Sequence, residues 1–126
     1  MIIIKNKAEI ELMREAGKIV ADTHEVIREA IIPGISTLEL DKIAEENIRK
    51  YNAVPSFKGY GGFPGSICSS INNKVVHGIP GNEIVKEGDI ISIDIGAYSI
   101  YCAALTFGFA ARNLQTRLRD LLRSFA

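Results

Sequence analysis

The spacing of the apolar residues changes once along this chain of 126 residues. Before residue 50 they recur every three or four positions, which places them on one face of a helix. Near residue 90 they occupy every second position, as in a strand with one buried face. A chain with both periods packs helices on strands, so we predict an α+β fold in which two helices cover antiparallel strands.

Two capping boxes mark the starts of the predicted helices. Asn6 and Ser36 are each followed three residues later by a glutamate, so that side chain and backbone can exchange hydrogen bonds at both helix starts. The pattern predicts a long helix that runs to Ala30 and a second helix that ends at Tyr51. We expect His24, within the first helix, at the surface.

Residues 55–65 contain four glycines, two prolines and the aromatic residues Phe57, Tyr60 and Phe63. Glycine lets a backbone approach a ligand closely, and aromatic rings can form the walls of an apolar pocket. We therefore predict a binding loop. The alternative is a loop that only packs on the core.

The next segment has the pattern of a hairpin. Residues 67–71 and 74–77 flank Asn72 and Asn73, and asparagine tolerates the left-handed backbone that a tight turn requires. We predict a hairpin that ends at His77. A turn histidine with a purely structural role is the alternative for this residue.

Residues 90–97 alternate between isoleucine and small or polar residues, which predicts a strand with Asp94 on its polar face. A carboxylate is costly to bury without a partner, so Asp94 requires a cation, a metal or several hydrogen-bond donors. The alternative is a carboxylate at the edge of the core without a catalytic role.

Charge and motifs exclude several classes of function. The 15 basic residues balance the 15 acidic ones, which removes the electrostatic argument for a nucleic acid or an acidic membrane as partner. No apolar stretch approaches the ~20 residues of a membrane helix, and GxxxxGK, GxSxG and paired CxxC motifs do not occur. Cys68 and Cys102, in a chain without an export signal, predict free thiols and a cytoplasmic location.

The composition changes near residue 98. All twenty isoleucines lie within residues 1–100, whereas five of the eight leucines follow residue 100. We therefore divide the chain into a first unit, residues 1–98, and a divergent tail, residues 99–126. Leucines at helical spacing in the tail predict a C-terminal amphipathic helix, which either packs on a core or binds a membrane or a partner.

Several sequence runs in the first unit, taken together, form a specific combination. They are KAEIELMREAG (7–17), PGISTLELD (33–41), GYGGFPGS (59–66), SIN (70–72), VHGIP (76–80) and GDIISIDIG (88–96). In this order they resemble the bacterial-type methionine aminopeptidases.

The resemblance implies the N-terminal half of a pita-bread fold, whose two pseudo-symmetric α/β halves surround antiparallel strands. It also implies a hydrolase that removes the initiator methionine from nascent proteins with two divalent metal ions, such as cobalt, manganese or iron. Proline dipeptidase shares this fold, but the short N-terminus and the VHGIP run favour the methionine enzyme.

The resemblance also implies roles for individual residues. Asp94 matches the first metal-binding aspartate, and His77 matches the catalytic histidine that contacts the substrate amide. Asn72 falls on a segment whose backbone lines a monovalent-cation site in some relatives. The residues that fall where the family binds the methionine side chain are Phe57, Tyr60, Phe63 and Cys68.

The second metal-binding aspartate of the family has no counterpart here. Its place holds Leu105, or Cys102 in a shifted alignment, and the remaining ligands lie in the C-terminal half of the family. We expect this chain alone to be inactive, with a homodimer or a complementing C-terminal half supplying ligands. The expected partner is a nascent polypeptide N-terminus, and a non-catalytic binding module is the alternative.

Overall fold

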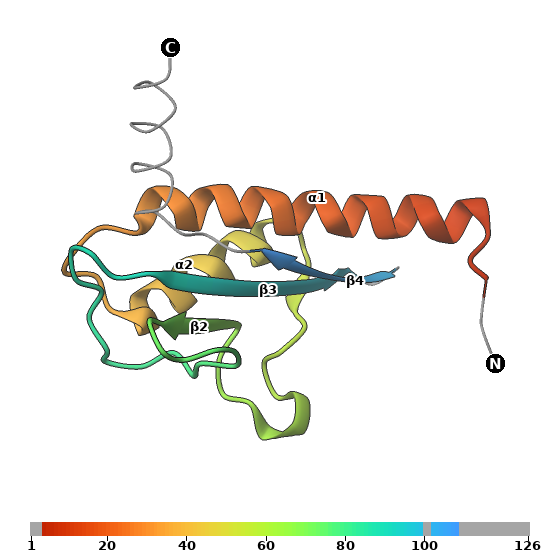
Figure 1. Ribbon diagram of the computed structural model, residues 1–126. Helices are drawn as coiled ribbons and strands as arrows, with labels where there is room; N and C mark the ends of the chain where they lie inside the picture. Colours follow the sequence, from red (N-terminus) through yellow and green to blue (C-terminus); the bar gives the residue numbers. More distant parts are fainter. Residues whose placement is uncertain (1–3, 100–101, 109–126) are drawn as a thin grey trace, which may run out of the picture.

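The computed structural model describes residues 4–99 and 102–108 (Figure 1). Two helices come first, followed by four strands and one 3-10 turn, which confirms the predicted α+β class. The elements in chain order are α1 (Lys7–Ala30), α2 (Thr37–Lys50), β1 (Val54–Pro55), the 3-10 turn Tyr60–Gly62, β2 (Ile67–Ile71), β3 (Ile91–Ser99) and β4 (Cys102–Gly108).

Both helices begin at the predicted capping boxes. The Asn6 side chain accepts a hydrogen bond from the Glu9 N–H at 3.0 Å, and the Glu9 carboxylate accepts one from the Asn6 N–H at 2.8 Å. The same exchange joins Ser36 and Glu39 at the start of α2. Because these bonds satisfy N–H groups that no helical carbonyl can reach, they fix where each helix starts.

The four strands form one antiparallel sheet around β3. β1 and β2 pair with one edge of β3, and β4 pairs with the other edge. α1 packs along β3 and β4, whereas α2 packs against β1 and β2 (Figure 1). The core lies between helices and sheet, and its most deeply buried side chains are Val20, Ile27, Leu40, Ile48, Ile67, Ile91, Ile93 and Ile95.

The predicted hairpin is wrong. β2 has the expected bounds, but it pairs with β3 and not with residues 74–77, which are not a strand. Asn72 is left-handed, with φ of 53°, and its side chain bonds both the Ile90 N–H and the Asp89 carboxylate. These bonds direct the chain out of the sheet, and Val75 is 81% exposed in the resulting loop.

Burial varies along α1, and one expectation about this helix also needs correction. Ile10 and Met13 continue its apolar stripe but are 45% and 40% exposed, so only the later turns contribute to the core. His24 is half-buried, and its Nε2 atom is inaccessible to solvent and has no hydrogen-bond partner among the described residues. Burial lowers the pKa of His24.

The boundary between residues 98 and 99 stays a prediction. β4 lies beyond it and continues the sheet through its pairing with β3. The predicted C-terminal amphipathic helix lies outside the described residues. No helix in the described part of the chain is long and apolar enough to cross a membrane.

Candidate functional site

Two neighbouring strands place Cys68 and Asp94 side by side. Cys68 on β2 is the register partner of Asp94 on β3, and paired residues of antiparallel strands point to the same face. Ile67 and Ile95 precede and follow them in sequence and are fully buried in the core beneath the helices. Because side chains alternate along a strand, Cys68 and Asp94 face the opposite side of the sheet.

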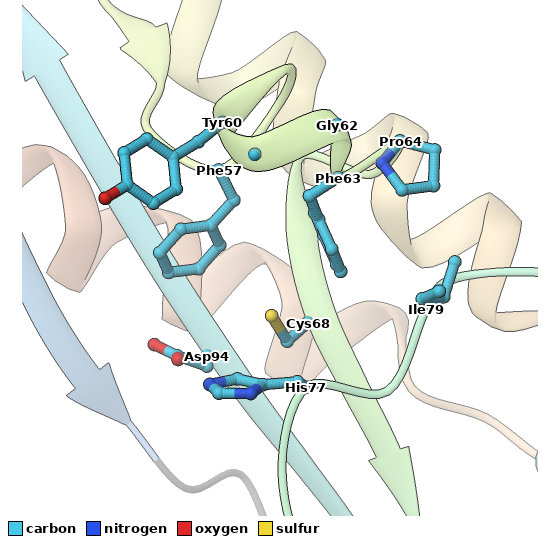
Figure 2. A pocket seen from close by; sticks show the side chains of 10 residues that line it. Phe57, Tyr60, Gly62, Phe63, Pro64, Cys68, His77, Ile79 and Asp94 are labelled. Atoms are coloured by element: carbon cyan, nitrogen blue, oxygen red, sulfur yellow. The ribbon is translucent and has the colours of Figure 1, made fainter.

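The aromatic loop, residues 56–66, begins and ends beside the same edge of β3. The two positions of β3 at which it begins and ends are two residues apart. Pro55 at its start pairs with Ala97, and Ile67 at its end pairs with Ile95. Both ends of the loop are therefore close together, and its tip carries the aromatic rings over the polar face of the sheet (Figure 2).

Glycines give the aromatic loop its shape. Three of them have φ of 84°, 56° and 83° in chain order, a region that suits glycine because it has no Cβ. They turn the chain through a single 3-10 turn at Tyr60–Gly62, as expected for a shaped loop. The rings of Phe57 and Phe63 then meet edge to face, with centroids 6.5 Å apart and planes at 86°.

His77 reaches the same face from a loop that is pressed against β2. Its backbone is left-handed, with φ of 56°, which costs a residue with a side chain about 1–3 kcal/mol. Gly78 follows, and a Cβ there would lie 2.0 Å from the Ser69 carbonyl oxygen. The Gly78 N–H donates to Ser70 Oγ at 3.0 Å, so the contacts of Gly78 fix the backbone that carries His77.

These elements surround a cavity of about 560 Å³, a volume typical of a small-ligand site. The rings of Phe57 and Phe63 form one wall, and Cys68, His77 and Asp94 lie together at the base (Figure 2). The other lining residues are Tyr60, Gly61, Gly62, Pro64 and Ile79. The cavity is thus mostly apolar, with its polar groups gathered at one end.

The base of the cavity has unusual electrostatics. Burial raises the pKa of Asp94, and the neighbouring His77 partly opposes this shift. The pKa of the Cys68 thiol rises to about 11, first because of burial and then because of the charges on Asp94 and Asp41. Cys68 is therefore a neutral thiol at physiological pH and serves the cavity as an apolar wall.

The described residues do not fit a complete centre for two metal ions. Within residues 4–99, no three His, Cys, Asp or Glu side chains gather in a group that could hold a metal. Asp94 and His77 supply one carboxylate and one imidazole, whereas stable binding of a divalent transition metal needs about four ligands. Leu105 on β4, which the sequence resemblance puts in the place of the second aspartate, is the register partner of Gly96 on β3.

Six of the seven residues with a role predicted from the sequence line this cavity: Phe57, Tyr60, Phe63, Cys68, His77 and Asp94. Asn72, the seventh, is not among its lining residues. Four residues could not be predicted from the sequence: Ile79 and Pro64 in the cavity wall, and Asp41 and Glu45 on α2, which bind the aromatic loop. A spacing of four residues puts Asp41 and Glu45 on one helix face. Nothing in the sequence indicates that this face meets the loop.

The profile of metallopeptidase family M24 matches residues 11–124. A methionine aminopeptidase of Clostridium acetobutylicum is 61% identical over 98 residues, which is 77% of this chain and 39% of that protein. A methionine aminopeptidase of Clostridium perfringens is 50% identical over 130 residues, covering 98% of this chain and 50% of that protein.

Solved structures agree with these relatives. The crystal structure of methionine aminopeptidase from Thermotoga maritima has a TM-score of 0.78 at 34% identity, and it covers 98% of this chain and 53% of that one. The crystal structure of aminopeptidase P from E. coli, at 22% identity and a TM-score of 0.69, supports the fold alone. The chain spans about half or less of the length of the methionine aminopeptidases that it matches.

Proposed function

The chain belongs to metallopeptidase family M24, and we propose that it carries the part of a methionine aminopeptidase that recognises the N-terminal methionine. The observation that supports this most directly is the cavity, in which aromatic walls lead to Cys68, His77 and Asp94 at the base. An unbranched thioether side chain suits such walls, because sulfur contacts aromatic rings favourably.

His77 is the proposed contact to the scissile amide. Its imidazole lies beside Asp94 at the base of the cavity, where the peptide bond of a bound methionyl residue would come to rest (Figure 2). An imidazole can donate a hydrogen bond to the amide and stabilise charge that develops on it. The close contact of Gly78 with β2 fixes the left-handed backbone that carries this ring.

Cleavage needs metal ligands beyond the described residues. The family is one of metallopeptidases, so hydrolysis depends on divalent metal, for which we propose cobalt, manganese or iron. Asp94 is the proposed ligand from this chain. We propose that a second copy or a complementing C-terminal half supplies the others, and that the substrates are nascent N-termini in the cytoplasm.

The test is methionine release from a Met-Ala-Ser peptide by the purified chain with added Co²⁺ or Mn²⁺. Asp94→Ala and a chelator serve as controls, because the variant exposes activity from a contaminating host enzyme. Release that both controls abolish supports a metal centre completed between chains. Absence of both release and peptide binding by the wild-type chain would refute the proposed function.

A non-catalytic binding module is the second candidate, because only one carboxylate and one imidazole gather at the base of the cavity in the described part of the chain. This candidate predicts binding of Met-Ala-Ser without release of methionine, with or without metal. Calorimetric titration of the peptide and of Mn²⁺ into the same sample distinguishes the two candidates, since only the enzyme binds metal stoichiometrically.

A further inference from the structure

Glu45 on α2 connects the two ends of the aromatic loop. Its Oε2 atom accepts a hydrogen bond from Lys58 Nζ at 2.5 Å and another from Ser66 Oγ at 3.1 Å. Lys58 follows the first residues of the loop, and Ser66 is its last residue. A single carboxylate oxygen therefore joins the start of the loop to its end.

The surroundings of Glu45 hold this carboxylate in place. Its other oxygen, Oε1, accepts hydrogen bonds from Arg49 Nε at 2.9 Å and Arg49 Nη2 at 2.7 Å. The Glu45 side chain is only 18% exposed, and Ser66 is fully buried. Both oxygens thus have partners, and the carboxylate has little freedom to turn away from the loop.

One turn earlier on the same helix face, Asp41 binds the backbone at the end of the loop. Its Oδ1 atom accepts hydrogen bonds from the N–H groups of Ser66 at 2.6 Å and Ile67 at 2.9 Å. Asp41 therefore anchors the loop where it enters β2 through hydrogen bonds that do not involve Lys58. Of these two carboxylates, only Glu45 bonds to both ends.

We propose that Glu45 is a positioning residue that closes the aromatic loop and thereby sets the shape of the pocket for the first side chain of the substrate. This inference rests on the proposed function, since it assigns the pocket to that side chain. Phe57 adjoins Lys58, and Phe63 lies three residues before Ser66, so closing the loop ends sets the distance between the two rings. Opening the ends of the aromatic loop should lower the preference of the pocket for methionine, with a smaller effect on the stability of the fold.

The test compares Glu45→Gln and Lys58→Gln, the double variant, and Lys58→Arg in the full chain. Arg28→Gln is the matched control, because it removes a comparable helical arginine–glutamate pair, with Glu25 on α1, that has no contact with the aromatic loop. Calorimetry with Met-Ala-Ser and Ala-Ala-Ser gives the affinity ratio, and hydrogen exchange of the Gly59 and Phe63 amides reports loop closure without any ligand.

We expect Glu45→Gln and Lys58→Gln each to lower the methionine-to-alanine affinity ratio about fivefold, the size of coupling typical of contacting residues. Exchange at Gly59 and Phe63 should become about tenfold faster in both. The double variant should lose no more than either single variant, Lys58→Arg should retain the wild-type ratio, and Arg28→Gln should change neither measurement more than about twofold.

Two results would overturn the inference separately from the proposed function. Unchanged exchange in both Glu45→Gln and Lys58→Gln would show that the pair does not close the loop. Faster exchange with an unchanged affinity ratio would show that closure does not shape the pocket. A wild-type chain that binds both peptides equally would instead refute the proposed recognition of methionine, and the inference with it.

Discussion

The two faces of the sheet are built from the same strands but are stabilised in different ways. On the face beneath the helices, Ile67, Ile93 and Ile95 are at most 1% exposed and contribute through burial alone. On the opposite face, Cys68 and Asp94 form the base of a cavity whose walls are loops held by individual hydrogen bonds. Burial should therefore govern the stability of the fold, and the loop contacts should govern binding.

The largest expected effect lies beneath the helices. Ile95→Ala removes a side chain that is 0% exposed and should lower the free energy of unfolding by about 2–5 kcal/mol, because the lost transfer energy adds to that of the cavity left behind. Urea denaturation followed by circular dichroism measures it. Val75→Ala, at 81% exposure, is the control and should change little. Equal effects of the two would contradict the account of this face.

The contact of Gly78 with β2 should come next. Gly78→Ala places a methyl group 2.0 Å from a backbone oxygen, so the His77 loop must shift, at a cost of about 1–3 kcal/mol. Gly81→Ala is the matched control, since a Cβ at Gly81 meets nothing within 4 Å. Unfolding measurements on both variants test this. A Gly78→Ala chain as stable as the control would show that the loop is not pressed on β2.

The Glu45 carboxylate makes the loop face sensitive to acid. The hydrogen bond from Lys58 is the first cause that lowers the pKa of Glu45 from 4.5 to about 2. A carboxyl group whose pKa is lowered by folding contributes stability above the unfolded value, and that contribution is lost as the pH falls from about 4.5 to about 2. We expect about 1–2 kcal/mol here, reduced by solvent because Lys58 is 45% exposed.

Unfolding of wild type and Glu45→Gln at pH 7, 4 and 2.5 measures this contribution. The two proteins should differ at pH 7 and converge toward pH 2.5. A difference that stays constant across this range would mean that the ionised carboxylate is not what stabilises the loop.

The smallest effect on stability should come from Tyr60. Its side chain is 82% exposed at the mouth of the cavity, so Tyr60→Ala should change the free energy of unfolding by less than about 0.5 kcal/mol. Loss of a pocket wall should still weaken binding of Met-Ala-Ser about fivefold, or about 1 kcal/mol. Melting and calorimetry on one sample separate the two. A large loss of stability with unchanged affinity would show that Tyr60 stabilises the fold and does not contribute to binding.

Local sequence patterns predicted the helices, β2 and β3, because these depend on neighbours in the chain. The capping glutamates lie three residues from Asn6 and Ser36, and the alternation of β3 lies within nine residues. The hairpin failed because its outcome depends on Asp89 and Ile90, which bind Asn72 from 17 and 18 residues away. No local pattern contains that contact.

The sequence predicts most of the residues that form the site, but not the contacts that hold the aromatic loop in place. A resemblance over sequence runs identified six of the residues that line the cavity, but not Pro64 or Ile79. The role of α2 in holding the loop depends on contacts over 13 to 26 residues, such as Glu45 with Lys58 and Asp41 with Ile67. From the sequence alone, Asp41 and Glu45 are expected on a solvent-exposed helix surface, where most carboxylates lie.

In the proposed function, one face of the sheet binds a methionine side chain, whereas the other face stabilises the fold. The most direct test is an NMR titration of the labelled full chain with Met-Ala-Ser, with Ala-Ala-Ser as the reference peptide. We predict shifts specific to the methionine peptide at Phe57, Phe63, Cys68 and His77, and none at Val20 or Ile27 in the helices. Shifts that are identical for both peptides, or that fall on the helices, would contradict the account.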